Sequence, residues 1–355
     1  MFRGTCNFRL LKRDVSRLDA GLRGAGDYRP YKRGVPRVGA GLRGVENFRL
    51  LKRGVSRLDA GLRGAGDEVP CISKFLAAAG GESKRKILRS RMKIPVNNTY
   101  LGYDDHGIGL PILFLPAFPL NRTMWQGELI TLLREERYRL IALDWRGFGE
   151  SEITDPISTM DLFADDVAGL MDTLGIQQAV LCGLSMGGYA SFAFTRKYPE
   201  RVCGLALADT RPGADTPEAQ TNRENVARIA ETQGTGAIAD LQIPRVLSEY
   251  TRQHHPEVEM HVRQMIEAAT VQGIAAASRG MAQRADSTDL LAHIACPTLV
   301  IVGEQDALTP PSVAQDYAAH IPGSRLVVIT NAGHLSNLEQ PEAFLQALQG
   351  FLVSI

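Results

Sequence analysis

The sequence predicts an α/β protein in which a mostly parallel central sheet is flanked by helices and carries a helical cap insertion. Three observations support this prediction. Short apolar runs rich in strand formers alternate with amphipathic stretches, which is the pattern of βαβ units. One of these runs, residues 179–184, leads through a glycine-flanked serine into a helical stretch. Residues 215–285 are instead polar and alanine-rich, with helical spacing and no strand pattern.

The charge distribution divides the chain near Met92. The 355 residues carry a net charge of +1, but residues 1–91 hold 22 Lys+Arg and 8 Asp+Glu. This leaves 18 of the 40 basic and 31 of the 39 acidic residues for the remainder. Such different compositions indicate separate parts. We expect an N-terminal arm over 1–91, an α/β core over 92–214 and 286–355, and a cap over 215–285.

Residues 7–66 consist of three copies of a 20-residue unit rich in Arg and Gly. Each copy has few apolar residues to bury against a neighbour, so the period does not predict a solenoid. The repeats are either a basic arm for nucleic acid or an anionic membrane, or a duplicated coding stretch upstream of a start at Met92. We favour the second interpretation and expect residues 1–91 to be largely disordered and dispensable. A nucleic-acid partner is expected only through residues 1–66.

Cysteine usage and hydropathy favour a reducing compartment. The five cysteines form no C-x-x-C pair and no metal-binding spacing, and their odd number fits no disulfide framework. No apolar run is long enough to span a membrane, and no secretory signal precedes the arm. No dinucleotide fingerprint or Walker loop is present. We therefore expect a cytoplasmic protein without membrane partner, metal ion or cofactor.

The elements before the serine follow from the apolar pattern. Residues 99–104 predict a strand that turns at 105–107, and the wholly apolar residues 111–115 are typical of a strand buried on both faces. The next predicted elements are a helix from about Thr123 to Arg134, a strand over 138–144 and a helix over 160–174.

The central motif is Gly183-Leu184-Ser185-Met186-Gly187, a G-x-S-x-G pattern between a strand and a helix. Side chains at either glycine would clash in so tight a turn, and the serine is expected in an unusual backbone conformation. The alternative is an ordinary glycine-rich loop.

Two further candidate residues follow later strands. A strand over 298–306 ends at Asp306, and His334 follows a strand over 325–329. The order Ser185, Asp306, His334 is that of a strand-end catalytic triad. Asp306 could instead cap a helix near Pro311, His334 could be a plain loop histidine, and Asp209, at the end of a strand over 202–210, is the second candidate acid.

These motifs together resemble those of the α/β-hydrolase superfamily over residues 97–355. The resemblance is carried by Phe118-Pro119, by Asp144-Trp145-Arg146-Gly147-Phe148-Gly149-Glu150-Ser151 and by Gly183-Leu184-Ser185-Met186-Gly187-Gly188. The segments 297–306 and 337–344 are most similar to those of 3-oxoadipate enol-lactonases and neighbouring small esterases. The resemblance implies a serine hydrolase that cleaves a small carboxylic ester or lactone.

The roles of the residues follow from this chemistry. Ser185 would attack a carbonyl, His334 would take its proton, and Asp306 would hold the imidazole. The N–H of Met186 and one from the loop after Leu115 would bind the oxyanion. Proline has no N–H, so only Ala117 and Phe118 can donate from that loop, and the resemblance points to Phe118. Relatives usually carry His-Gly where this chain has Pro116-Ala117, and alanine disfavours a positive φ.

The residues around the substrate are less well defined by the sequence. Phe118, Trp125 and Met186 either line an apolar acyl pocket or belong to the core. A substrate carboxylate could bind a cap arginine, and the candidates are Arg245, Arg252 and Arg263.

Other activities fit the same residues. A serine at the elbow argues against dehalogenases and epoxide hydrolases, whose relatives use aspartate there. A cofactor-free perhydrolase, a C–C bond hydrolase and a non-catalytic binding protein on this scaffold remain alternatives. The acyl group, the leaving group and the oligomeric state do not follow from the sequence.

Overall fold

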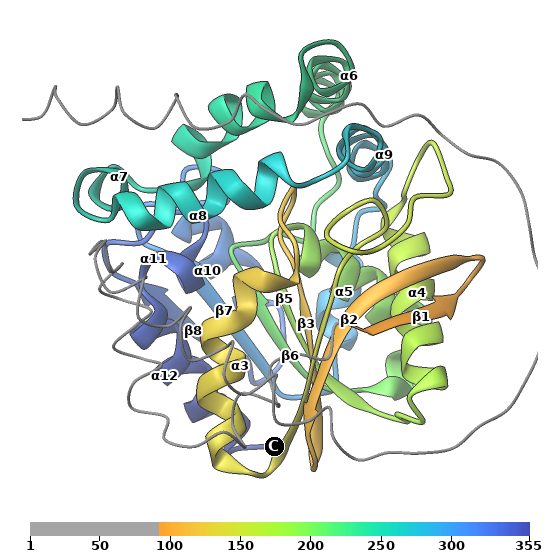
Figure 1. The fold of residues 1–355 in the computed structure, drawn as a ribbon. Coiled ribbons are helices and arrows are strands. Elements are labelled where there is room, and N and C mark those ends of the chain that lie inside the picture. Colours follow the sequence, from red (N-terminus) through yellow and green to blue (C-terminus); the bar gives the residue numbers. More distant parts are fainter. Residues whose placement is uncertain (1–91) are drawn as a thin grey trace, which may run out of the picture. The chain divides into compact units, whose positions relative to one another are not determined.

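The computed structural model describes residues 92–355, so the predictions for residues 1–91 lie outside the described part. The described residues form an eight-stranded sheet in the order β1-β2-β4-β3-β5-β6-β7-β8, with helices on both faces (Figure 1). The predicted α/β fold is confirmed. The strands are β1 (Met92–Val96), β2 (Thr99–Gly107), β3 (Leu110–Leu115), β4 (Tyr138–Leu143), β5 (Ala179–Leu184), β6 (Val202–Ala208), β7 (Thr298–Gly303) and β8 (Arg325–Ile329).

The strand pairing brings the ends of six strands to one edge of the sheet. The pairs β1–β2 and β2–β4 are antiparallel, and all later pairs are parallel. At the centre, Leu113 of β3 is in register with Ile141 of β4 and Leu181 of β5. Every residue of β5 and β7 is buried, as the continuous apolar runs predict. Loops that follow these parallel strands therefore meet at the carboxyl edge, where open α/β sheets place their sites.

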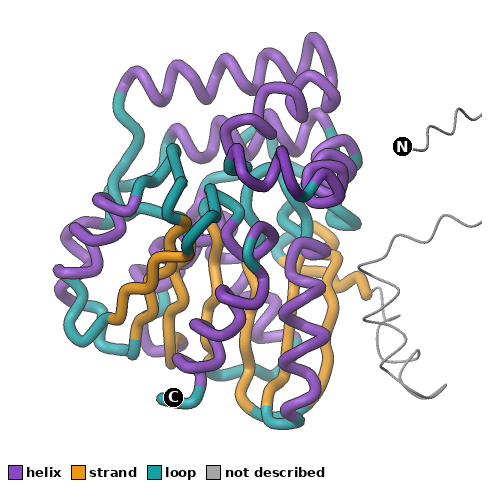
Figure 2. The backbone as a smooth tube through the Cα atoms, turned by 90° about the vertical axis from the view of Figure 1, so that its left-hand side faces the viewer, coloured by secondary structure: helices purple, strands orange, loops and turns teal. Residues whose placement is uncertain are grey.

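The two faces of the sheet are covered by different helices. On one face, α3 (Gln126–Leu132) contacts α12 (Pro341–Leu352). On the other, α4 (Met160–Thr173) packs on α5 (Met186–Lys197), and Phe192 of α5 meets Tyr317 of α10 (Pro311–Ala319) edge to face. Figure 2 shows the resulting layers, with helices on either side of the strands.

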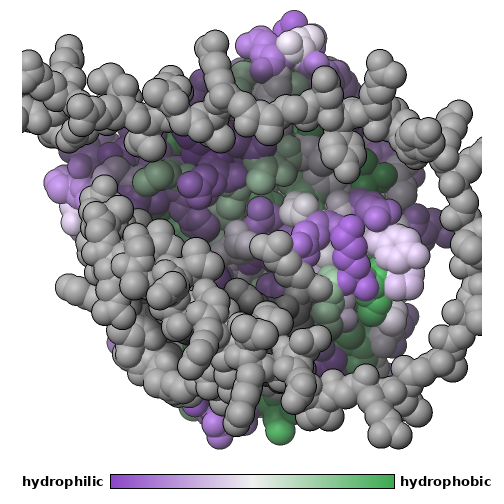
Figure 3. All heavy atoms as spheres, viewed as in Figure 1, coloured by the Kyte–Doolittle hydropathy of each residue, from purple (hydrophilic) through white to green (hydrophobic). Residues whose placement is uncertain are grey.

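Four helices between β6 and β7 form an insertion beyond the carboxyl edge, at the top of Figures 1 and 2. On the face shown in Figure 3, hydrophilic side chains dominate this end of the molecule, with hydrophobic ones interspersed. We call these helices the α6–α9 insertion. They are α6 (Pro217–Val246), which is kinked at Gly234, α7 (Glu249–His254), α8 (Pro256–Glu267) and α9 (Val271–Ala282).

Helix α9 contacts the core backbone to backbone. A Cβ built at Gly273 would lie 2.3 Å from the carbonyl oxygen of Gly147, and one at Gly280 would lie 1.7 Å from that of Ser158. Thr270, the N-cap of α9, donates its hydroxyl to Gly147 O at 2.8 Å. Glycine at these positions lets α9 approach the loop after β4 this closely.

The structure corrects several predicted boundaries. The turn expected at 105–107 does not occur, because His106 and Gly107 continue β2 by pairing with Leu140 and Arg139 of β4. The helix expected from Thr123 begins instead as a 3-10 turn, η2 (Arg122–Trp125). The sequence does not predict β1 or the short helix α11 (Ser336–Glu339), which follows His334. The other short helices are η3 (Leu133–Glu135), η4 (Pro199–Arg201) and η5 (Thr288–His293).

Candidate active site

Ser185 occupies a strained turn between β5 and α5. Its backbone has φ 55° and ψ −110°, a conformation that few side-chain-bearing residues adopt. A Cβ at Gly183 would lie 2.4 Å from the Gly187 oxygen, and one at Gly187 would lie 2.1 Å from the Leu115 oxygen. Both glycines are therefore required by close backbone contacts, as the sequence predicts. The second contact also brings the end of β3 directly against the start of α5.

His334 links the serine to Asp306. Its Nε2 lies 2.8 Å from Ser185 Oγ, and its Nδ1 lies 2.8 Å from Asp306 Oδ2. The three side chains come from the loops after β5, β7 and β8, so the shared carboxyl edge brings them together over long sequence separations. All three residues are almost fully buried, with Ser185 8% exposed.

The loop after β7 holds Asp306 as an ionised acceptor. Its Oδ1 accepts the N–H groups of Leu308 and Thr309, and its Oδ2 accepts the Thr309 hydroxyl at 2.6 Å. Burial opposes the charge of Asp306, but the facing His334 and the hydrogen bonds from Thr309 outweigh it, so its pKa lies below the usual value. An ionised Asp306 is suited to accept a hydrogen bond from the Nδ1–H of the imidazole, and its negative charge favours the imidazolium form.

Asp209, the second candidate acid, is engaged elsewhere. Its Oδ1 accepts the Gly303 N–H at 2.8 Å, and its Oδ2 accepts the Ser336 hydroxyl. Burial, together with the negative charge of Asp306, raises the pKa of Asp209 well above its usual range. Of the two carboxyl groups, it is Asp306 that contacts His334.

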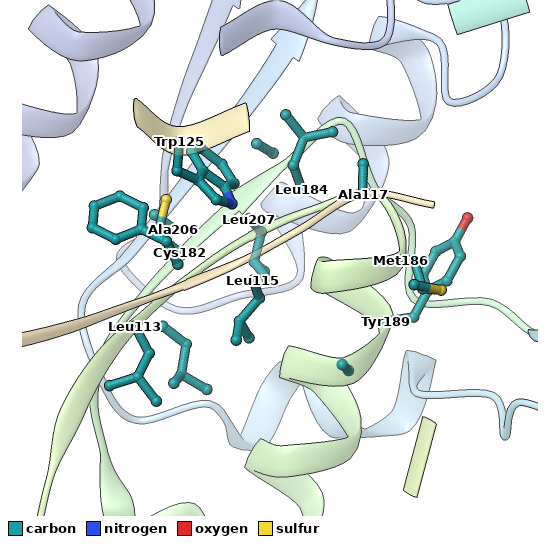
Figure 4. Close-up of a cluster of buried hydrophobic side chains, with 14 of the residues drawn as sticks. Leu113, Leu115, Ala117, Trp125, Cys182, Leu184, Met186, Tyr189, Ala206 and Leu207 are labelled. Atoms are coloured by element: carbon teal, nitrogen blue, oxygen red, sulfur yellow. The ribbon is translucent and has the colours of Figure 1, made fainter. Parts of the chain in front are cut away.

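The loop after β3 passes beside the start of α5. Figure 4 shows Leu115 and Ala117 passing the start of α5, from which Met186 and Tyr189 project. The Ala117 N–H is directed to the sulfur of Met124 at 3.3 Å. Neither Ala117 nor Phe118 has a positive φ, so the loop does not need the glycine that relatives carry.

The N–H groups of Phe118 and Met186 have no hydrogen-bond partner within residues 92–355. They are the two donors that the sequence singles out for an oxyanion. Trp145 fixes the loop after β3, because its indole N–H donates to Pro116 O at 2.8 Å and its ring stacks on Phe163.

Trp125 has the contacts of a core residue. It is fully buried, and its ring packs against Phe114 at 5.3 Å and Phe344 at 5.9 Å between ring centroids. In Figure 4, Trp125 and Tyr189 lie on opposite sides of the strands.

The three arginines considered for a substrate carboxylate lie on α6, α7 and α8. Arg263 forms ion pairs with Asp240 and Glu267, whereas Arg245 and Arg252 are exposed. None of these contacts places an arginine beside Ser185.

Sequence reasoning missed three residues that support the site: Trp145, Thr309 and Glu339. Thr309 carries a detectable signal, since a hydroxyl three residues after a strand-end aspartate suits an Asx-type turn. The acceptor for Trp145 is distant in sequence, and so are Ser248 and Thr251, two partners of Glu339. These contacts could not be read from the sequence. In the part of the chain that the structure describes, no helix is long and apolar enough to cross a membrane, and no three His, Cys, Asp or Glu side chains form a group suited to a metal ion.

The fold and site are those of an α/β enzyme scaffold with a serine at a strand-to-helix elbow. Residues 111–341 match the family described as alpha/beta hydrolase fold. The chain belongs to the α/β-hydrolase fold family.

Relatives within the family carry several names. The chain is 30% identical over 244 residues to 3-oxoadipate enol-lactonase 1 of Acinetobacter baylyi, covering 69% of this chain and 89% of that protein. It is 29% identical over 267 residues to a putative non-heme bromoperoxidase, BpoC, of Mycobacterium tuberculosis, covering 72% of this chain and 98% of that one.

Two solved structures are similar in fold and sequence. A thermophilic esterase from Thermogutta terrifontis, with malate bound, is 48% identical with a TM-score of 0.72, covering 75% of this chain and 98% of that one. The enol-lactonase from Burkholderia xenovorans LB400 is 31% identical with a TM-score of 0.69. The match covers 74% of this chain and 100% of that one. The expected resemblance to enol-lactonases and small esterases is thereby confirmed.

Proposed function

We propose that the protein is a serine hydrolase that cleaves a small carboxylic ester or lactone through an acyl-enzyme on Ser185. The observation that carries this proposal is the hydrogen-bonded series from Ser185 Oγ through His334 to Asp306, with 2.8 Å at both imidazole nitrogens. A serine hydroxyl is a weak nucleophile until a base takes its proton, and this geometry supplies the base and its orienting carboxylate.

In the first half of the reaction, Ser185 Oγ attacks the substrate carbonyl while His334 Nε2 takes its proton. The N–H groups of Met186 and Phe118 then donate to the oxyanion, and Asp306 stabilises the imidazolium. As the tetrahedral intermediate collapses, His334 returns the proton to the leaving oxygen. In a lactone that oxygen stays attached to the acyl group.

In the second half, water attacks the acyl-enzyme. His334 takes a proton from the water and returns it to Ser185 Oγ, which releases the carboxylic acid. The 8% exposure of Ser185 limits the number of water molecules at the acyl group. We propose that the α6–α9 insertion acts as a cap that provides this shielding.

The names of the relatives support an ester or lactone substrate. An enol-lactonase is 31% identical, and the esterase at 48% identity was solved with malate bound. We propose a small substrate of this class, with a carboxylate on the acyl or leaving group.

The test uses the full chain with p-nitrophenyl acetate, p-nitrophenyl butyrate and a panel of enol-lactones. We expect Ser185→Ala to lower kcat/KM by about 10³-fold or more, because the nucleophile is removed. Ser191→Ala is the matched control, since Ser191 lies in α5, which follows Ser185, and its hydroxyl donates to Gly187 O. Equal rates for the parent and Ser185→Ala would contradict the proposal.

A second candidate is perhydrolysis, which the bromoperoxidase relative favours. The same acyl-enzyme would transfer its acyl group to hydrogen peroxide in place of water, giving a peracid. Peracid formation from an ester and hydrogen peroxide, absent in Ser185→Ala, would identify this activity.

A further inference from the structure

The loop that carries His334 lies directly against the junction of α6 and α7. His334 N donates to Val246 O at 3.1 Å. A Cβ at Gly333 would lie 2.7 Å from the Ser248 nitrogen and 3.2 Å from the Leu247 carbonyl carbon. The glycine before His334 is therefore required because the backbone of the insertion passes over it.

Glu339 joins these two segments through both of its carboxylate oxygens. Its Oε1 accepts the N–H groups of Gly333 at 2.9 Å and Leu335 at 3.3 Å. Its Oε2 accepts the Ser248 N–H at 2.8 Å and the Thr251 hydroxyl at 2.7 Å. Glu339 and Ser248 are each 4% exposed and Thr251 is fully buried, so water does not compete for these bonds.

The two oxygens of the Glu339 carboxylate bind different segments, Oε1 the loop that carries His334 and Oε2 the start of α7. The Oε1 donors are the peptide N–H groups immediately before and after His334, so this oxygen fixes the backbone that aims the imidazole at Ser185. The Oε2 donors belong to the start of α7, where the Ser248 side chain accepts the Thr251 N–H at 3.0 Å and caps the helix. A shift of α7 would therefore pull on the carboxylate that holds the histidine loop.

We propose that Glu339 is a positioning residue that makes the placement of His334 depend on α7 being seated against the histidine loop. The inference rests on the proposed function, because only a catalytic His334 gives this coupling a kinetic effect. Glu339 acts through the backbone of residues 333–335. The insertion thus contributes to the geometry of the base as well as covering the site.

The test is Thr251→Val in the full chain, with Thr251→Ser as the matched control that keeps the hydroxyl. Valine has the shape of threonine but removes one hydrogen bond to Glu339 on the α7 side, together with the bond that Ser248 Oγ donates to Thr251 Oγ1 at 3.0 Å. It leaves both Oε1 bonds in place. We expect kcat for p-nitrophenyl butyrate to fall about tenfold with KM changed less than about twofold, as for the loss of one hydrogen bond to a charged group. Thr251→Ser is expected to restore kcat.

Hydrogen–deuterium exchange provides a readout that does not require turnover. We expect Thr251→Val to speed exchange at the Gly333 and Leu335 amides as well as in α7, because both sides share one carboxylate. Faster exchange confined to residues 248–254 would overturn the proposal, and so would an unchanged kcat. If the parent hydrolyses no ester or lactone, the proposed function fails, and exchange at residues 333–335 alone decides whether α7 holds the loop.

Discussion

The pKa values of two buried aspartates near His334 are shifted in opposite directions. Asp306 receives three hydrogen bonds from its own loop and faces the imidazole, which lowers its pKa. Asp209 is enclosed beside it, and burial raises its pKa. Two carboxyl groups this close do not ionise independently, so a negative charge on Asp306 disfavours one on Asp209.

This difference predicts unequal effects of the same substitution. Asp306→Asn is expected to lower kcat/KM by about 10³-fold or more, because the amide cannot hold the correct imidazole tautomer. Asp209→Asn keeps the size of a side chain that does not contact His334 and is expected to change kcat/KM by less than about fivefold. Ester hydrolysis by the two purified variants checks this. A larger loss in Asp209→Asn than in Asp306→Asn would reverse the assignment of the acid.

At the scale of elements, close backbone contacts set where helices can pack. Helix α9 approaches the loop after β4 through Gly273 and Gly280, and α5 approaches the end of β3 through Gly187. At each point a side chain would occupy space that another backbone fills. Helix α3 shows the contrast, because its exposed Gly127 has no other heavy atom within 4 Å of a built Cβ.

The difference between Gly280, which is in close contact with another backbone, and the exposed Gly127 predicts opposite effects of alanine on stability. Gly280→Ala would place a methyl group 1.7 Å from the Ser158 oxygen, and we expect it to lower the free energy of unfolding by about 2 kcal/mol or more. Gly127→Ala is expected to raise it by about 0.5–1 kcal/mol, because alanine reduces the entropy of the unfolded chain without a clash. Urea unfolding followed by circular dichroism measures both. Equal effects would show that α9 adjusts without cost.

The sequence predicts most elements of the core but fewer of the contacts between them. The runs that become β3, β5 and β7 are recognisable because strands buried on both faces must be apolar throughout. β1 was not predicted, since only Val96 is buried among its five residues and its pattern is weak. The order of Ser185, Asp306 and His334 indicates the site. Trp145 contacts Pro116, and Glu339 contacts Ser248 and Thr251. These partners are far away in sequence, and no local pattern encodes them.

At the scale of the whole molecule, relatives match only part of the chain. The esterase structure is covered over 98% of its length by 75% of this chain. The family match begins at residue 111, after the change of charge at Met92. That residues 1–91 are dispensable stays a prediction.

Global stability is expected to depend on the buried Glu128. Burial raises the pKa of Glu128 to about 8, because no cation among residues 92–355 faces the buried carboxyl group. The folded protein therefore keeps a proton that the unfolded chain releases between about pH 4.5 and pH 8. The stability from the neutral form is fully present below about pH 4.5 and is lost as pH rises through about 8.

Glu128→Gln should remove this dependence, because glutamine has nearly the same size and stays neutral at every pH. Between pH 5 and pH 8 we expect the parent to lose roughly 3 kcal/mol of unfolding free energy relative to Glu128→Gln. Urea unfolding at the two pH values measures the difference, with the exposed Glu218→Gln as control. Parallel pH curves for the parent and Glu128→Gln would mean that Glu128 is ionised in the folded protein.

The contact between Glu339 and the start of α7 also bears on how this family can diversify. Segments 246–251 and 333–339 are far apart in the gene, yet they share one carboxylate and one glycine contact. Consider a chimaera in which the α6–α9 insertion comes from another family member. Its segment 246–251 would then come from one parent and its segment 333–339 from the other. The contacts of Glu339 and Gly333 are kept only when both segments come from the same parent. We therefore expect such chimaeras to be active when the two segments are exchanged together.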